Sequence, residues 1–171
     1  MYQRILVPFD GSATSSRGLD EAIGIATLTG ASLRLIHVLD ILEFTSGFET
    51  AAVYTDHVIP CMRRAGQDIL QNGKDRAEKA GMRVDTVLLE AMKTRLSEVV
   101  AEQAKAWGAD LIVIGTHGRR GVSRLMLGSD AEQIVRTSPV PVLLVRAPDA
   151  AADVAKSVRA AGNAVANKIA A

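Results

Sequence analysis

The chain has 171 residues and a net charge of +1, with 48% hydrophobic, 23% charged and 4% aromatic residues. This length suits one domain with an aliphatic core, and the balanced charge gives no reason to expect nucleic acid or an acidic membrane surface as a partner. No apolar run is long enough to span a membrane. The single cysteine, Cys61, excludes an intrachain disulfide. Since Met1–Arg4 also leaves no room for a signal peptide, we expect a soluble, cytoplasmic protein.

Two apolar runs and one amphipathic segment open the chain. The run Ile5–Phe9 predicts a first strand, which stops at the turn signal Asp10-Gly11-Ser12. Ser12 or Ser15 can cap the helix that follows, and Gly30 ends it. The run Leu33–Leu39 predicts a second strand.

The middle of the chain is less regular. Residues 40–56 show no clear period and are longer than an ordinary connection, so they could form a mobile flap. A helix is predicted over about 58–80, although Asn72-Gly73 weakens the expectation of one unbroken helix. Residues 84–89 predict a third, partly alternating strand.

Helical and strand-like segments alternate again in the last third. The predicted elements are a helix over 94–107, a strand over 111–114, a helix over 129–137 and a strand over Val140–Val145. The tail, 147–171, is alanine-rich with apolar residues at roughly helical spacing, and it could dock on the domain, pair with another chain or fray. We therefore expect one domain over 1–146 and a separate, helix-like tail.

This alternation predicts the fold class. Strands that are apolar on both faces and separated by helices are typical of a parallel sheet covered on both sides. With right-handed crossovers, the result is an α/β, doubly wound sheet of about five strands. In such a sheet a ligand binds beyond the carboxyl ends of the strands, where the strand order reverses.

A glycine-rich segment follows the buried run Leu111–Ile114. It reads Gly115-Thr116-His117-Gly118, then nine residues, then Gly128-Ser129. Glycine turns let a backbone approach a phosphate closely, and Gly128 and Ser129 would present N–H groups and a hydroxyl at a helix start that favours an anion. The alternative is a loop with glycine turns and a serine cap. Because the full spacing lies between a strand and a helix, we favour the phosphate of a nucleotide.

Asp10 follows the first strand and has two interpretations. If strands one and four are neighbours, its loop faces the same crevice as the glycine motif. Its carboxylate could then accept hydrogen bonds from ribose hydroxyls. Alternatively, Asp10 is a turn residue before Gly11-Ser12. The sequence leaves both interpretations open.

Other polar residues near the motif have less certain roles. Three arginines in the loop could reach phosphates or simply be exposed: Arg119, Arg120 and Arg124. His117 is better placed to shape the loop than to transfer a proton. Asp130 would either weaken nucleotide binding by repulsion or help to hold Mg²⁺ through water. His37 and His57 are isolated and indicate no metal cluster.

These motifs make residues 1 to about 146 resemble the universal stress protein family. The matching pieces are Ile5–Ser12, Ala109–Gly115, the glycine motif and Ser138–Val145. The resemblance implies an adenine nucleotide alpha hydrolase-like fold, with helices on both faces of a five-stranded sheet of order 3-2-1-4-5. Because the glycine motif is complete, it also implies the ATP-binding branch of the family.

The resemblance also implies particular contacts. Pro8 and Asp10 would line the adenosine end, with Asp10 on the ribose, and Val38 would meet adenine through its backbone. Ribose and phosphates would be held by Gly115, Gly118, Gly128, Ser129 and the N–H of Asp130. Two positions depart from the family pattern. Asp130 replaces a small or apolar residue, and Glu90-Ala91-Met92 lacks a glycine that is often found there.

The family commonly dimerises through strand five, so we expect a homodimer through Val140–Val145. An open apolar edge strand invites such pairing, although Pro139 and Pro141 restrict its hydrogen bonds. Covering of this edge by the tail is the alternative.

The sequence favours binding over catalysis. It lacks the P-loop G-x4-G-K-[ST] and the kinase signatures, and no general base is placed to activate water, so no catalytic residue is assigned. We expect a nucleotide-responsive stress or regulatory module that acts on an unidentified protein partner. The alternatives are a slow ATPase or adenylate-handling enzyme and a structural, partner-binding dimer whose pocket stays empty.

Overall fold

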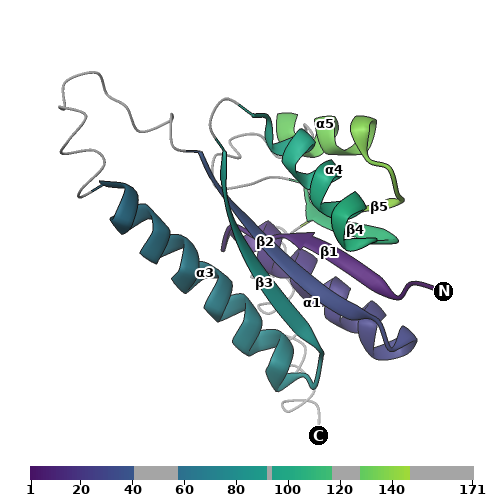
Figure 1. Cartoon of the computed structure of the whole chain (residues 1–171). Coiled ribbons are helices and arrows are strands. Elements are labelled where there is room, and N and C mark those ends of the chain that lie inside the picture. The colour runs from purple at the N-terminus through teal and green to yellow at the C-terminus, as the bar shows by residue number, and fades with distance from the viewer. Residues whose placement is uncertain (41–57, 92–93, 117–127, 147–171) are drawn as a thin grey trace, which may run out of the picture.

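The computed structural model describes residues 1–40, 58–91, 94–116 and 128–146, which form one sheet with helices on both faces (Figure 1). The elements are β1 (Arg4–Pro8), α1 (Ala13–Thr29), β2 (Ser32–Asp40), α3 (Ile59–Lys79), β3 (Val84–Ala91), α4 (Leu96–Trp107), β4 (Leu111–Gly115), α5 (Ser129–Thr137) and β5 (Val142–Val145). The five strands lie in the order β3-β2-β1-β4-β5, and all neighbours are parallel. The expected fold class and strand order are confirmed.

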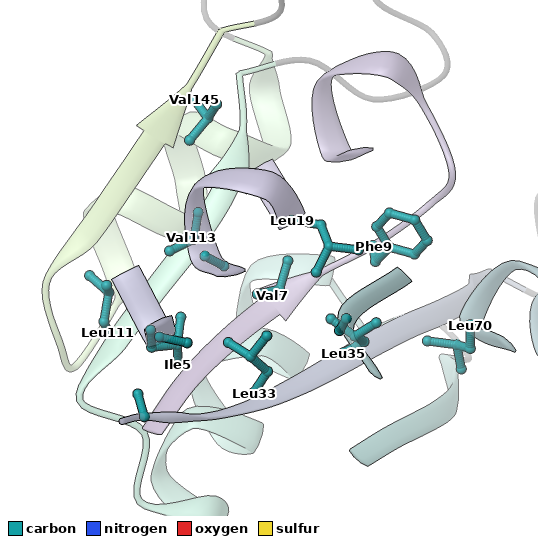
Figure 2. Packing of buried hydrophobic residues seen from close by; sticks show 14 residues of the cluster. Ile5, Val7, Phe9, Leu19, Leu33, Leu35, Leu70, Leu111, Val113 and Val145 are labelled. Carbon is teal, nitrogen blue, oxygen red and sulfur yellow. The ribbon is translucent and has the colours of Figure 1, made fainter. Parts of the chain in front are cut away.

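Each face of the sheet carries its own hydrophobic core. Strand residues alternate between the two, so that Ile5 and Val7 join side chains of α1 and α3, whereas Leu6 joins side chains of α4 and α5. Figure 2 shows the first of these cores, with Leu19 of α1 and Leu70 of α3 on the same side of the sheet. Fully burying a leucine side chain contributes about 1.5–3 kcal/mol, so these aliphatic layers hold the strands in register.

Helix α1 begins and ends as expected. The hydroxyl of Ser12 accepts a hydrogen bond from the N–H of Ser15 at 3.2 Å, and Ser12, rather than Ser15, is the cap. Gly30 ends the helix in the left-handed region, at φ +73°. A side chain at that φ would be strained, which is why glycine stops the helix there.

Helix α3 runs unbroken through Asn72-Gly73. Gly73 is buried, and a Cβ atom there would lie 2.8 Å from the Phe9 ring and 2.9 Å from Leu35. Two turns earlier, a Cβ atom at Gly66 would lie 2.7 Å from Leu88. Both glycines let α3 lie close to the sheet. This packing offsets the helix propensity of about 1 kcal/mol that each glycine lacks relative to alanine.

Strand β5 is shorter than expected, because it begins at Val142 rather than Val140. Pro141 has no N–H to donate to the ladder, and only its carbonyl takes part, by accepting the N–H of Ile112 at 3.0 Å. The strand nevertheless lies at the edge of the sheet, next to β4.

Two expectations lie outside the described residues: the flap, which apart from Asp40 falls in 41–57, and the fold of the tail over 147–171. None of the described helices combines the length and the apolar character that a membrane span requires.

Candidate functional site

Four segments meet at the carboxyl edge of the sheet. Strands β1 and β4 are neighbours, with Leu6 paired to Ile112, as the proposed crevice requires. The turn after β1 leads into α1. Thr116, which follows β4, is hydrogen-bonded to Gly128, which precedes α5. The strand order also reverses between β1 and β4, the position where ligands bind in doubly wound sheets.

Asp10 shapes the turn after β1. One carboxylate oxygen of this half-buried residue accepts the N–H of Ser12 at 2.9 Å, and the hydroxyl of Ser12 lies 3.2 Å from that of Thr14. The turn interpretation of Asp10 is therefore confirmed for one oxygen. A carboxylate has lone pairs on both oxygens and about four acceptor sites in total, so this bond and a ribose contact are compatible.

Gly115, the last residue of β4, packs against the start of α1. A Cβ atom at this position would lie 2.8 Å from the carbonyl carbon of Thr14 and 3.0 Å from the N atom of Ser15. Any larger residue would push α1 away from the sheet. The sequence suggested a ligand-binding role for this glycine, and the structure gives it a packing role that the sequence analysis missed.

Gly128 closes the glycine-rich segment onto the end of β4. Its N–H donates to the carbonyl oxygen of Thr116 at 3.0 Å, and the N–H of Thr116 donates to Val145 of β5 at 2.9 Å. In this conformation Thr116 already takes that donor, and a contact between Gly128 and a phosphate remains a prediction. The carbonyl of Gly128 accepts the N–H of Glu132 at 2.9 Å and so starts α5.

The start of α5 differs from that of α1. Gly128 occupies the cap position, and no side chain caps the helix in the described part of the chain. Ser129 is the first helical residue and is exposed, so it is not the serine cap of the alternative interpretation. The first N–H groups of a helix have no partner within it, so the first turn of α5 is the more suitable of the two helix starts for an anion.

Two carboxylates also lie in this first turn. Glu132 forms an ion pair with Arg136 at 2.8 Å, whereas Asp130 is exposed and has no side-chain partner among the residues that the structure describes. A carboxylate here is stabilised by the helix dipole and competes with a phosphate for it.

The remaining expected contacts are partly covered by the structure. Pro8 at the end of β1 and Val38 on β2 are both half-buried. Gly118 and Arg119 lie outside the described residues, as do His117, Arg120 and Arg124.

An ion pair holds the neighbouring corner of this edge. Arg63 of α3 and Glu90 of β3 form two hydrogen bonds, one of them 3.0 Å long between Nη2 and Oε2. The hydrogen bond from Arg63 lowers the pKa of the Glu90 carboxyl below its ordinary value, against the opposing effect of burial. The pair ties the N-terminal part of α3 to the end of β3.

His37 is a functional candidate that sequence analysis passed over as an isolated histidine. It is 7% exposed on β2 and lies 2.8 Å, Nδ1 to O, from the carbonyl oxygen of Phe9. Its polarity within the apolar run Leu33–Leu39 was the available signal. No group of three or more His, Cys, Asp or Glu side chains suited to a metal occurs among the described residues.

Known proteins are similar to this chain in sequence and fold. The Universal stress protein family model matches residues 1–146. Universal stress protein MJ0531 of Methanocaldococcus jannaschii is 34% identical over 148 residues, which cover 86% of this chain and 84% of that protein.

Solved structures are also similar to this chain. Hypothetical protein MJ0577, solved for a structure-based assignment of its biochemical function, is 27% identical with a TM-score of 0.73, covering 88% of this chain and 99% of that one. A universal stress protein in complex with cAMP is also 27% identical, with a TM-score of 0.59 and coverage of 86% and 98%. Because the family model matches residues 1–146, which include all the described residues, this chain belongs to the universal stress protein family.

Proposed function

We propose that this protein binds ATP at the carboxyl edge of β1 and β4 and acts as a nucleotide-responsive regulatory module of the stress response. In this proposal the adenosine lies against the ends of β1 and β2, and the phosphates lie against the first turn of α5. The contacts would be made by Pro8, Asp10, Val38, Gly115, Gly118, Arg119, Gly128, Ser129 and the N–H of Asp130.

The observation that carries the proposal is the start of α5. The bond from Gly128 to Thr116 fixes this helix beside the end of β4, and no side chain among the described residues caps its first turn. By contrast, Ser12 caps α1 at the same edge. An uncapped helix start at the reversal of strand order favours a phosphate as ligand.

The nature of the base and sugar is supported by two further observations. Asp10 lies at the end of β1, the strand next to β4, where a carboxylate suits ribose hydroxyls. The related structure in complex with cAMP contains an adenine nucleotide. Because cAMP carries one phosphate, a comparison of ATP with AMP tests how many phosphates the site accepts.

We further propose a homodimer through β5. This strand is at the sheet edge, and Val142, Leu143 and Leu144 are only half-buried within one chain. A second copy would cover their exposed area, as open apolar edges favour.

The exposed thiol of Cys61 agrees with a reducing, cytoplasmic location.

Identification of the bound molecule tests the proposal. Freshly purified protein is denatured, and mass spectrometry of the released small molecules should detect ATP or another adenine nucleotide in near-stoichiometric amount. Calorimetry of nucleotide-free protein with ATP, AMP and GTP then compares affinities. If no adenine nucleotide is released and none binds, the structural, partner-binding alternative replaces this proposal.

Hydrolysis is decided in the same preparation. Single-turnover phosphate release is measured for the wild type and for Gly118→Val. Slow phosphate release that is the same in the wild type and in Gly118→Val agrees with a regulatory role, because the site then binds ATP without efficient turnover. Fast release that the variant abolishes makes the protein an ATPase.

A further inference from the structure

A buried histidine underlies the turn that carries Asp10. His37 lies on the face of β2 that α3 covers, and a Cβ atom at Gly66 of α3 would be 3.1 Å from its Cδ2 atom. The side chain is 7% exposed. A polar ring in such a place costs free energy unless it is hydrogen-bonded, so its partner indicates what the ring does.

A backbone partner fixes the role of one ring nitrogen. Nδ1 of His37 lies 2.8 Å from the carbonyl oxygen of Phe9. A carbonyl oxygen only accepts hydrogen bonds, so Nδ1 carries the proton and donates. The bond joins a side chain of β2 to the backbone just beyond the end of β1.

This bond completes the attachment of Phe9 to β2. The last paired residues of the two strands are Pro8 and Ile36. Beyond them, the N–H of Phe9 donates to the carbonyl of Ile36 at 2.8 Å, and its carbonyl accepts from His37. Both backbone groups of Phe9 are therefore held by β2, and its ring is held by α3 at Gly73.

The held residue directly precedes Asp10. The carboxylate of Asp10 is in turn oriented by the N–H of Ser12 at 2.9 Å. The side chain of Ile69 packs near Gly11 of the same turn, 3.6 Å from where a Cβ atom would be. The backbone of the turn is thus fixed from β2 and from α3, so its carboxylate is presented in one direction.

We infer that His37 is a positioning residue for ribose recognition. This inference rests on the proposed nucleotide site, and it adds to that site a residue that does not touch the ligand. By donating to Phe9, His37 fixes the backbone from which the Asp10 carboxylate reaches the sugar hydroxyls. A leucine could fill the same apolar space but would leave the Phe9 carbonyl without its donor.

The test uses two substitutions with opposite expectations. His37→Leu removes the donor at similar volume. His37→Asn keeps an N–H donor near the position of Nδ1. Leu33→Ala is the matched control, because Leu33 is buried in the same core on the other end of β2. Thermal melting first confirms that all variants fold.

Affinity for ATP and for 2′,3′-dideoxy-ATP is then measured by calorimetry. We expect His37→Leu to weaken ATP binding about fivefold to tenfold, the equivalent of one lost hydrogen bond, and to leave dideoxy-ATP binding nearly unchanged. His37→Asn should recover most of the ATP affinity. Leu33→Ala should lower the melting temperature without changing the preference for ATP over dideoxy-ATP.

A double substitution shows whether the effect passes through Asp10. If it does, Asp10→Ala with His37→Leu should bind ATP no more weakly than Asp10→Ala alone. Equal losses for ATP and dideoxy-ATP, or additive losses in the double variant, would overturn the inference and leave the proposed function standing. Failure of the wild type to bind any adenine nucleotide would instead overturn the proposed function, and the inference with it.

Discussion

The N–H of Gly128 donates to the carbonyl oxygen of Thr116 at 3.0 Å, although eleven residues separate them in the sequence. This bond brings the start of α5 back to the end of β4. It also means that the glycine at the end of the motif serves the backbone of the protein itself. The amides available to a ligand are then those that follow it, in the first turn of α5.

Replacement of Gly128 tests this arrangement. Its φ of −59° and ψ of 145° are accessible to any residue, so Gly128→Val should fold. The branched side chain would stand at the cap position, in the path of a phosphate, and should weaken ATP binding by roughly 2–3 kcal/mol, the equivalent of lost hydrogen bonds to a charged group. Calorimetry measures the loss. Gly24→Val is the control, because Gly24 faces open space on α1, and unchanged ATP affinity in Gly128→Val would refute the phosphate placement.

Asp10 can be divided into its two roles. Asp10→Asn keeps an oxygen that can accept the N–H of Ser12 but removes the charge, whereas Asp10→Ala removes both. We expect Asp10→Ala to weaken ATP binding by roughly 1–3 kcal/mol, the range for a lost hydrogen bond to a charged group, and to lower the melting temperature as well. Asp10→Asn should keep the melting temperature and lose part of the affinity. Calorimetry and thermal melting separate the two, and an ATP dissociation constant that neither variant changes would exclude ribose contact.

The elements of the fold could be predicted because their local patterns agree with the final structure. The buried run Leu111–Ile114 is recognisable from its apolar character alone, and Gly30 from its position beside an apolar stripe, whereas the sequence left the N-cap open between Ser12 and Ser15. The end of β5 nearest Pro141 was predicted too long, since apolar character does not reveal which residue can donate to a neighbouring strand.

Residues whose roles depend on distant partners could not be predicted. Gly73 counted against an unbroken α3 because propensity is local, whereas the Phe9 ring that it accommodates is 64 positions away in the sequence. Gly115 is predicted to contact a ligand because it begins the glycine motif, whereas in the structure it packs against Thr14. The same limit explains why His37 passed unnoticed.

Gly73 and Gly24 are a matched pair that tests whether α3 needs a glycine for its close approach to the sheet. Both are helical glycines, so replacement by alanine gains up to about 1 kcal/mol of helix propensity at either position. Gly24→Ala should be stabilising. Gly73→Ala should be destabilising by about 1–2 kcal/mol, because overpacking against Phe9 and Leu35 outweighs that gain. Urea unfolding of the two variants decides, and stabilisation of both would show that α3 does not need its close approach to the sheet.

The ion pair of Arg63 and Glu90 predicts a pH dependence. Since the hydrogen bond from Arg63 lowers the pKa of Glu90 in the folded protein, its stabilisation is complete above the ordinary glutamate pKa of about 4.3 and is lost as the pH falls through the lower, folded value. Glu90→Gln should therefore melt at a lower temperature than the wild type at pH 7, and the difference should disappear in acid. Melting curves from pH 7 to pH 3 measure it. A difference that grows in acid would contradict the assignment, and a smaller effect at high salt is expected for so exposed a pair.

We expect Asp130 to influence how many phosphates the proposed site accepts. Without a metal, its carboxylate at the helix start repels a polyphosphate, so Asp130→Asn should tighten ATP by the order of 0.3–1 kcal/mol, the usual size of a helix-end charge effect, and should change AMP less. If Asp130 instead holds Mg²⁺ through water, the same substitution should weaken ATP only when Mg²⁺ is present. Titrations of ATP and AMP with and without Mg²⁺ separate the cases. Glu132→Gln is the control, since Arg136 already balances that charge, and if Asp130→Asn behaves like this control under all four conditions, neither role of Asp130 survives.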